Sequence, residues 1–247
     1  PDLKPELKTT KEVGLELSLL DRRLGIDFTY YDVTTTDLIT PIEVDGSTGF
    51  SAKSFNAGKL QNKGIEATVT INPVRTQDFR WDITWNFAQN NNKLLELVDG
   101  TNELTLANAP FQARLLAVVG QPYGQIYGTD FTYDANGNKV VDADGAYIPS
   151  AQKSLGTVTP KYNMGLRNNF KYKNLNFGFL IDMQEGGSYF STSHMWGSYS
   201  GMLEHTATPG LRENGVVVDA VYEDGTKNTS VLPGQTWAQQ HYGLDAM

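Results

Sequence analysis

Large apolar and polar residues alternate along the stretch from Gly64 to Phe87, on either side of a short polar turn. In the first half, "GIEATVTI", every second residue from Ile65 to Ile71 is apolar, and Glu66 and threonines lie between them. In the second half, "FRWDITWNF", large apolar residues again occupy every second position. A period of two is typical of β-strands with one apolar and one polar face. The pattern therefore predicts two neighbouring strands that share an apolar side.

Six segments of the chain carry this alternation, and no segment of comparable length has the residue spacing of an amphipathic helix. The chain is therefore predicted to be all-β. The strands are expected near residues 12–20, 24–33, 63–72, 79–90, 161–172 and 175–184.

The connections between these strands alternate strictly between short and long. Tight turns are expected at residues 21–23, 73–78 and 173–174, and long connections at 34–62, 90–160 and after 184. Loops longer than about 15 residues are unusual in compact domains. Outer-membrane barrels, in contrast, combine short periplasmic turns with long extracellular loops. The connections therefore favour part of an antiparallel transmembrane β-barrel whose apolar side faces lipid.

The large aromatic residues of the strands fit two membrane interfaces. Trp81 and Tyr172 lie beside the short turns, whereas Tyr30, Trp85 and Phe87 lie toward the long connections. Tryptophan and tyrosine are enriched where a membrane meets water. The alternative is a soluble, secreted all-β binding or adhesive module, in which the same aromatics pack a protein core.

The other side of each strand is polar and carries ionisable groups. In a barrel this side would line a wet lumen, where charged side chains stay hydrated and avoid the cost of burial. The residues expected to face the lumen are Glu16, Asp27, Glu66, Arg80, Asp82, Arg167 and Asp182.

Composition narrows the function classes further. The 247 residues include no cysteine, so thiolate metal sites and disulfides are excluded. A net charge of -8 argues against nucleic acid as a partner, because phosphate binding needs a basic surface. No run approaches the roughly 18 apolar residues of a membrane-spanning helix. The opening "PDLKPELK" is not a signal peptide, and we expect both ends of the chain to have been cut.

Several strings resemble a known family of membrane proteins. They are "PDLKPELKTTKEVGLEL", "NAGKLQNKGIEATV", "FRWDITWNFAQNNNKLLEL", "GQPYGQIYGTDF" and "LGTVTPKYNMGLRNNFKYKNLNFGFLIDMQEGGSYF". In this order they are similar to the carboxy-terminal barrel portion of SusC/RagA-type TonB-dependent outer-membrane transporters. The resemblance covers residues 1–190 and implies about six strands of a 22-stranded barrel. Residues 191–247 would then be an extracellular loop region, truncated before the final strands.

The resemblance also implies a function and partners. Members of this family import glycans or peptides across the outer membrane of Gram-negative bacteria. They work with a SusD-like surface lipoprotein as a lid, and TonB supplies the energy through an amino-terminal part that this sequence lacks. Outer-membrane lipid and an oligosaccharide or peptide substrate would complete the list of partners.

One short string suggests a metal site. In "DANGNKVVDADG" the oxygen-bearing side chains of Asp134, Asn136 and Asn138, followed by Asp142, resemble the start of a Ca²⁺ loop. The twelfth position, which should be glutamate, is Gly145, so the match is incomplete. The alternative is a polar loop with Asn-Gly and Asp-Gly turns. Ca²⁺ is the one cofactor that the sequence suggests.

Aromatic residues in the long connections are candidates for substrate contact, because loops often carry binding residues. The candidates are Tyr127, Tyr133, Tyr189 and Trp196. They could instead pack loop against loop or meet the lid protein. No nucleophile elbow or other catalytic arrangement is recognisable, so we expect a transporter rather than an enzyme.

Overall fold

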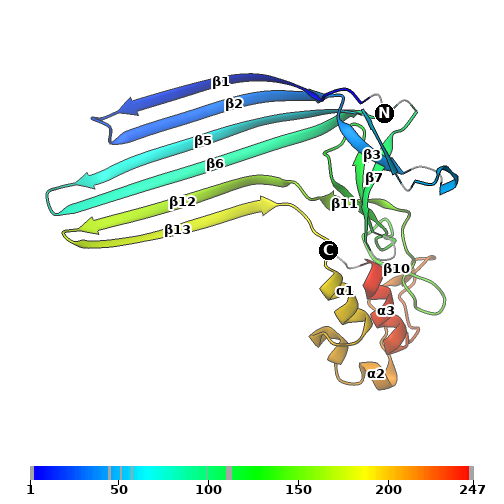
Figure 1. Ribbon diagram of the computed structural model, residues 1–247. Helices are drawn as coiled ribbons and strands as arrows, with labels where there is room; N and C mark the ends of the chain where they lie inside the picture. Colours follow the sequence, from blue (N-terminus) through cyan, green and yellow to red (C-terminus); the bar gives the residue numbers. More distant parts are fainter. Residues whose placement is uncertain are drawn as a thin grey trace. The chain divides into compact units, whose positions relative to one another are not determined.

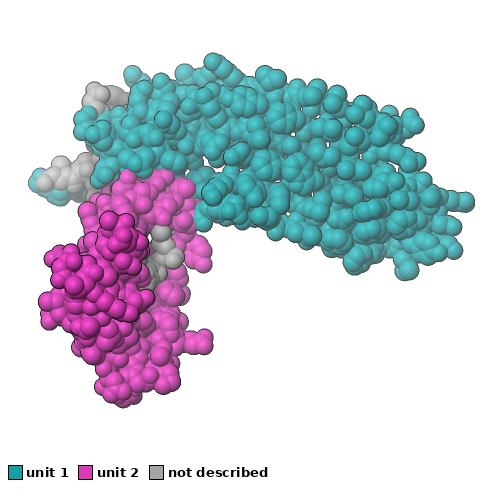
Figure 2. All heavy atoms as spheres, turned by 180° about the vertical axis from the view of Figure 1, so that it is seen from behind, with its two compact units in different colours: residues 1–104, 117–123, 159–187 teal, residues 105–116, 124–158, 188–247 magenta. Residues whose placement is uncertain are grey.

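The computed structural model describes residues 3–43, 46–50, 52–56, 58–98, 100–109 and 113–244. The chain divides into two compact units (Figure 2). Unit 1 comprises residues 1–104, 117–123 and 159–187, and unit 2 comprises residues 105–116, 124–158 and 188–247. The long connection at 90–160 is therefore shared between the two units.

Unit 1 is built on a six-stranded antiparallel sheet of long strands (Figure 1). In spatial order its strands are β1 (Leu7–Leu19), β2 (Leu24–Thr36), β5 (Lys59–Arg75), β6 (Phe79–Glu96), β12 (Pro160–Tyr172) and β13 (Leu175–Gly186). The three short turns join β1 to β2, β5 to β6 and β12 to β13, and they lie at the same end of the sheet. The long connections leave from the opposite end.

The first short turn is tight and is tied to the neighbouring strand. Leu20, Asp21 and Arg22 adopt positive φ angles, and the backbone N–H of Arg23 donates to the carbonyl of Leu20. The N–H of Asn72 donates to the carbonyl of Arg23 at 2.7 Å, which links the first turn to the neighbouring strand. Positive φ is costly for residues other than glycine, so this turn depends on the two strands that it joins.

The strands are longer than the apolar alternation predicts. β5 begins at Lys59 rather than near residue 63, and β6 ends at Glu96 rather than near residue 90. These extensions carry polar side chains on both faces, including the ion pair of Lys59 with Glu96 at 3.4 Å, and the paired Leu60 and Leu94 lie on the side that is polar in the rest of the sheet. Alternation signals one continuous apolar face, so it is lost where the faces are mixed. The strands continue there because backbone pairing continues.

The long connections contain regular structure that the sequence pattern does not reveal. β3 (Ile39–Glu43) pairs with β4 (Ala52–Asn56), with η1 (Gly46–Thr48) between them, and β7 (Glu103–Asn108), β8 (Arg114–Val118), β9 (Gln125–Gly128) and β11 (Lys153–Thr157) form a four-stranded sheet. Within residues 191–247, expected to be loop, lie α1 (Thr192–Tyr199), η2 (Glu204–Ala207), α2 (Leu211–Asn214) and α3 (Gly234–Leu244). These elements are short, so they leave little periodicity in the sequence. None of the described helices has the length and apolar character needed to cross a membrane.

Unit 2 contains an eight-residue repeat. "FTYDANGN" and "KVVDADGA" follow each other directly. The second residues of the two repeats are Thr132 and Val140, and Ile148 stands at the same position eight residues after Val140. The N–H of Thr132 donates to Ile148, that of Ile148 to Val140 and that of Val140 to Thr132, at 2.9, 3.1 and 2.9 Å. Each repeat turns at a glycine with positive φ, Gly137 or Gly145, where other residues would be strained. Three equivalent segments thus close a ring of backbone hydrogen bonds.

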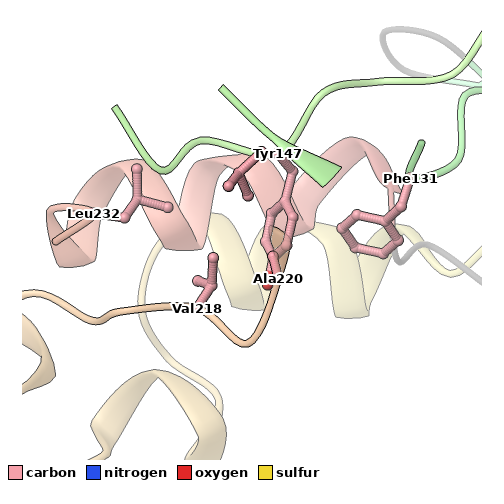
Figure 3. Packing of buried hydrophobic residues seen from close by; sticks show 6 residues of the cluster. Phe131, Tyr147, Val218, Ala220 and Leu232 are labelled. Carbon is pink, nitrogen blue, oxygen red and sulfur yellow. The ribbon is translucent and has the colours of Figure 1, made fainter. Parts of the chain in front are cut away.

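The core of unit 2 packs against this repeat (Figure 3). Its buried members are Phe131, Val141, Tyr147, Val218, Ala220 and Leu232. The rings of Phe131 and Tyr147 meet edge to face, with centroids 4.7 Å apart. The short parallel pair of β10 (Val140–Val141) with β14 (Val221–Tyr222) brings the second part of the core to the first. Unit 2 therefore has an interior of its own.

Candidate functional site

The polar face of the six-stranded sheet brings together the charged residues expected to line a lumen. Strand register places Glu16 opposite Asp27, Asp27 opposite Thr68, Thr68 opposite Asn86, Asn86 opposite Gly165 and Gly165 opposite Asp182. Directly opposed residues share a face of a sheet, so this row crosses all six strands on one side. Because side chains alternate along each strand, the same side carries Glu66, Arg80, Asp82 and Arg167. All seven predicted residues thus lie on one face.

The opposite face is apolar and remains open. One row across it consists of Leu15, Phe28, Ala67, Phe87, Met164 and Met183. Leu15 is 54% exposed and Phe177 65% exposed, although both are large and apolar. A soluble monomer rarely leaves such a wide apolar surface uncovered. Among the described residues of unit 1, no second layer covers this face, which differs from the packed core of a soluble module.

The apolar band has the height of a membrane barrel wall. Along β6 it runs from Phe79 to Phe87, eight residue steps, or about 26 Å at roughly 3.3 Å per residue. For strands tilted by about 40° the band is roughly 20 Å high, close to the apolar belt of about 25 Å in outer-membrane barrels. This face thus resembles the lipid-facing belt of an outer-membrane barrel in its height as well as in its apolar character.

Two aromatic clusters lie on the apolar face. Near the short turns, Trp81 stacks on Phe170 with ring centroids 5.4 Å apart, and Phe170 stacks on Phe177 at 6.1 Å. Toward the long connections, Trp85 and Phe87 stack at 5.8 Å, and Phe87 extends the cluster to Tyr162 at 5.5 Å. Clusters at both ends of the band are what interfacial girdles require.

One polar residue interrupts the apolar face. Asn168 lies in the row between Ile83 and Phe179 and is only 6% exposed. Its side-chain oxygen accepts a hydrogen bond from the indole N–H of Trp81 at 3.1 Å. A buried amide is tolerated when it is hydrogen-bonded, and the bond also fixes the orientation of Trp81.

The polar face is concave in its middle. A depression of about 370 Å³ lies over β5, β6, β12 and β13, and its polar lining includes Glu66, Asn86, Asn163 and Asp182. It exists because Gly165, which has no side chain, lies at its floor between Asn86 and Asp182. Amides and carboxylates around a hollow can hydrogen-bond to polar groups of a ligand, such as hydroxyls or peptide amides.

Charge is unevenly distributed along the polar face. Near the short turns, Arg80 forms an ion pair with Asp82 at 2.7 Å, and the side chain of Asn72 also donates to Asp82. Further along, Glu16 lies directly opposite Asp27, two like charges that repel each other. Within the described residues no lysine or arginine is within ion-pair distance of Glu16, Asp27, Glu66 or Asp182. Such an arrangement needs water or a cationic group in front of it.

Asn92 anchors a loop segment to β6, a role that the sequence pattern does not predict. Its side-chain oxygen accepts from the N–H of Tyr123 at 2.6 Å, and its amide donates to Thr159 at 3.0 Å. Beside it, Leu94 is fully buried, and its backbone pairs with Gln121 and Gly120. An asparagine in a run of three asparagines gives no sequence signal for this contact.

In the predicted Ca²⁺ loop, the carboxylate of Asp134 accepts hydrogen bonds from groups of the same loop. One carboxylate oxygen of Asp134 accepts from the N–H groups of Asn136 and Asn138, both at 2.8 Å, and the other accepts from the Asn138 side chain at 3.0 Å. These bonds, led by that from the Asn138 side chain, hold the pKa of the Asp134 carboxyl below its usual range. Asp142 repeats the pattern with Asp144 and Ala146. Among the described residues no three His, Asp or Glu side chains form a group that could hold a metal.

The aromatic candidates for substrate contact all lie in unit 2, and the rings that two of them contact are close in sequence. Tyr133 is 46% exposed and meets Phe131 edge to face at 6.4 Å. Trp196, also 46% exposed, meets Tyr199 of the same helix at 5.8 Å. Tyr189 is 78% exposed, whereas Tyr127 in β9 is half-buried. Their role in binding substrate remains a prediction.

A serine and a histidine meet in the helical part of unit 2. The hydroxyl of Ser198 lies 3.2 Å from Nε2 of His205, and the His205 ring stacks on that of His194 at 5.7 Å. Ser198 is fully buried, so its hydroxyl is inaccessible to a substrate. The contact therefore joins η2 to α1 rather than forming a nucleophile and base.

Known proteins are similar to this chain in sequence and in fold. The family model described as "TonB dependent receptor-like, beta-barrel" matches residues 1–234. TonB-dependent receptor P3 of Formosa agariphila is 29% identical over 90% of this chain, which covers 26% of that receptor. TonB-dependent receptor SusC of Bacteroides thetaiotaomicron is 29% identical over 73% of this chain, which covers 19% of that receptor.

Solved structures agree on the fold. The structure titled "Structure of the RagAB peptide transporter" superposes with a TM-score of 0.67 at 19% identity, over 80% of this chain and 23% of that one. The same importer in its "open-open" state superposes with a TM-score of 0.66 at 20% identity, over 94% of this chain and 26% of that one. The chain thus spans between about a fifth and a quarter of the length of these proteins.

Proposed function

Because the chain belongs to the TonB-dependent receptor β-barrel family, we propose that it is part of an outer-membrane importer that takes up oligomeric nutrients with energy from TonB. Its six long strands are part of a large antiparallel transmembrane β-barrel. In the proposal the short turns face the periplasm and the long connections face the outside of a Gram-negative cell. A SusD-like lipoprotein would close the outer opening as a lid.

The observation that supports the proposal best is the contrast between the two faces of the sheet. One face is apolar, exposed and edged by aromatic clusters at both ends, and the other carries carboxylates, arginines and amides across all six strands. A wall of this kind separates lipid from water. Glu16, Asp27, Glu66, Arg80, Asp82, Arg167 and Asp182 would then line the lumen.

The depression beside Gly165 is the proposed place on this wall where substrate rests. Its amides and carboxylates suit the hydroxyls of an oligosaccharide and the backbone of a peptide alike. RagAB is named a peptide importer, and this is a reason to test peptides first. The aromatic candidates of unit 2, Tyr127, Tyr133, Tyr189 and Trp196, would meet the substrate outside the lumen.

Uptake by the full-length receptor tests the proposal. Cells in which it is the sole importer should accumulate a labelled oligosaccharide or peptide library, and a protonophore or deletion of TonB should reduce accumulation to background. Asn86→Trp would fill the depression and should reduce uptake at unchanged surface expression, whereas Thr29→Trp, on the same face but outside the lining, should not. Uptake that persists without TonB would contradict the proposal.

A further inference from the structure

Three lysines lie on the outward side of the sheet, just past the end of the apolar band. Lys11, Lys63 and Lys93 are on the same side of their strands as Leu15, Ile65 and Phe87, by strict alternation. All three are exposed. The apolar band ends at the row of Val13, Tyr30, Ile65 and Gln89, and the next row on this side is Lys11, Asp32, Lys63 and Asn91. Lys93 follows one row later, opposite Gln61.

The spacing groups the three ammonium groups. Lys11 and Lys63 are separated by one strand, so their backbones are roughly 10 Å apart at about 4.8 Å per strand. Lys63 and Lys93 are diagonal neighbours on adjacent strands, roughly 7–8 Å apart. Flexible lysine side chains can cover such distances and converge on one or two anionic groups.

The only acid in these rows is already engaged. Asp32 accepts from Lys63 at 3.2 Å through one carboxylate oxygen and from the Gln61 side chain at 2.9 Å through the other. Among the described residues, no carboxylate lies within ion-pair distance of Lys11 or Lys93. Three lysines and one aspartate leave two positive charges on this spot, in a chain whose net charge is -8.

The position of the three lysines relative to the apolar band indicates which kind of molecule they contact. Its first row lies two residues, roughly 6.6 Å along the strand, beyond the apolar band and at the end where the long connections leave. In the proposed orientation this is the level of the head groups of the outer leaflet, and the side chains point sideways into the lipid rather than over the lumen. Cationic residues beside an apolar membrane surface attract anionic head groups.

We propose that Lys11, Lys63 and Lys93 form a docking surface for phosphate groups on lipids of the outer leaflet. The surface would hold one or two lipid phosphates against the barrel at its extracellular interface. The inference rests on the membrane orientation of the proposed function but concerns lipid rather than the imported substrate.

The test is lipid binding by the full-length receptor. The receptor is purified in an uncharged detergent, and binding of lipid A with its two phosphates is titrated by native mass spectrometry. Each of Lys11→Gln, Lys63→Gln and Lys93→Gln should weaken binding about fivefold, the effect expected of one cation at a membrane surface. Lys8→Gln is the matched control, because Lys8 lies three residues from Lys11 on the same strand but on the polar side.

Several results would overturn the inference. Equal loss of binding in Lys8→Gln would show an unspecific charge effect, and unchanged binding in the triple variant would show that the lysines are not involved. Equal binding of dephosphorylated lipid A would exclude phosphate as the recognised group. Loss of a co-purifying protein, with lipid binding retained, would assign the surface to a protein partner. TonB-dependent uptake is measured separately, so failure of the proposed function is distinguishable from failure of the lipid surface.

Discussion

Replacing Ile83 with arginine tests which face of the sheet meets lipid. Ile83 lies on the apolar face at the centre of the band in β6, four residues from Phe79 and four from Phe87. With a band roughly 20 Å high, its side chain is roughly 10 Å from either edge. An arginine at the midplane of a barrel wall costs about 2–4 kcal/mol, which corresponds to an unfolding equilibrium changed about 30- to 700-fold.

Two control variants separate the effect of depth in the membrane from the effect of the face of the sheet. Val13→Arg lies on the same face at the edge of the band, where the expected cost is about 0–1 kcal/mol. Asn86→Arg lies on the polar face of the same strand, next to Gly165, which leaves room for the longer side chain. Thr84 is a poorer control, because Arg167 lies directly opposite and would repel a new arginine.

The assay is guanidinium unfolding of the full-length barrel refolded into lipid vesicles, followed by tryptophan fluorescence. We expect a lower unfolding midpoint for Ile83→Arg than for Val13→Arg and Asn86→Arg. Equal stability of the Ile83 and Asn86 variants would refute the lipid assignment of the apolar face. A larger loss for Asn86→Arg would mean that the faces have been assigned the wrong way round.

Four further predictions concern local contacts. Asn92→Ala removes two hydrogen bonds at 2.6 and 3.0 Å, so backbone amides of residues 117–123 should exchange hydrogen faster, with stability lowered by about 1–3 kcal/mol; unchanged exchange would show that Leu94 alone holds the segment. Tyr222→Phe removes the oxygen that accepts from the N–H groups of Thr229 and Ser230 at 3.1 and 3.0 Å, and proteolysis near residues 228–230 should become faster than in a Tyr189→Phe control. Because the pKa of the Asp134 carboxyl is lowered in the folded protein, its carboxylate stabilises the turn at pH values above the pKa that this carboxyl has in the unfolded chain. This contribution is lost as the pH falls through the pKa that the carboxyl has in the folded protein. Asp134→Asn should therefore weaken the turn at neutral pH but not at strongly acidic pH. Because the turn already uses these oxygens, calorimetry with millimolar Ca²⁺ should give no saturable heat, and heat that Asp134→Asn abolishes would establish the metal site instead.

The sequence predicts the sheet better than the connections for a physical reason. Because one face of the sheet contacts lipid and the other water, apolar and polar residues alternate along strands such as β6 and β13. This alternation gives a period of two residues that can be recognised in the sequence. The polar row from Glu16 to Asp182 follows from that period once the register is known. Register itself is a property of backbone pairing, so the depression at Gly165 could not be found from sequence alone.

The connections obey different rules. The extensions of β5 and β6 carry polar residues on both faces, and their paired Leu60 and Leu94 lie on the otherwise polar face, so the apolar period is lost there. The eight-residue repeat does have a signal, because Asp134 and Asp142 each stand three residues before a glycine. That spacing also resembles a metal loop, in which Ca²⁺ binding stays a prediction, and in the structure the Asp134 carboxylate accepts hydrogen bonds from its own turn. Short motifs of oxygen ligands and turn-capping motifs use the same residues, and geometry alone separates them.

The edges of the sheet explain why these strands need others. Within the described residues, the outer sides of β1 and β13 have no pairing strand. Every residue of β1 is exposed, and Leu175, Phe177 and Ile181 of β13 are more than half exposed. Unpaired backbone groups are costly in lipid, where water cannot satisfy them, so a membrane wall must close on itself. Neighbouring strands of a complete barrel would therefore pair with the two open edges, and the lipid around that barrel would cover the exposed apolar face.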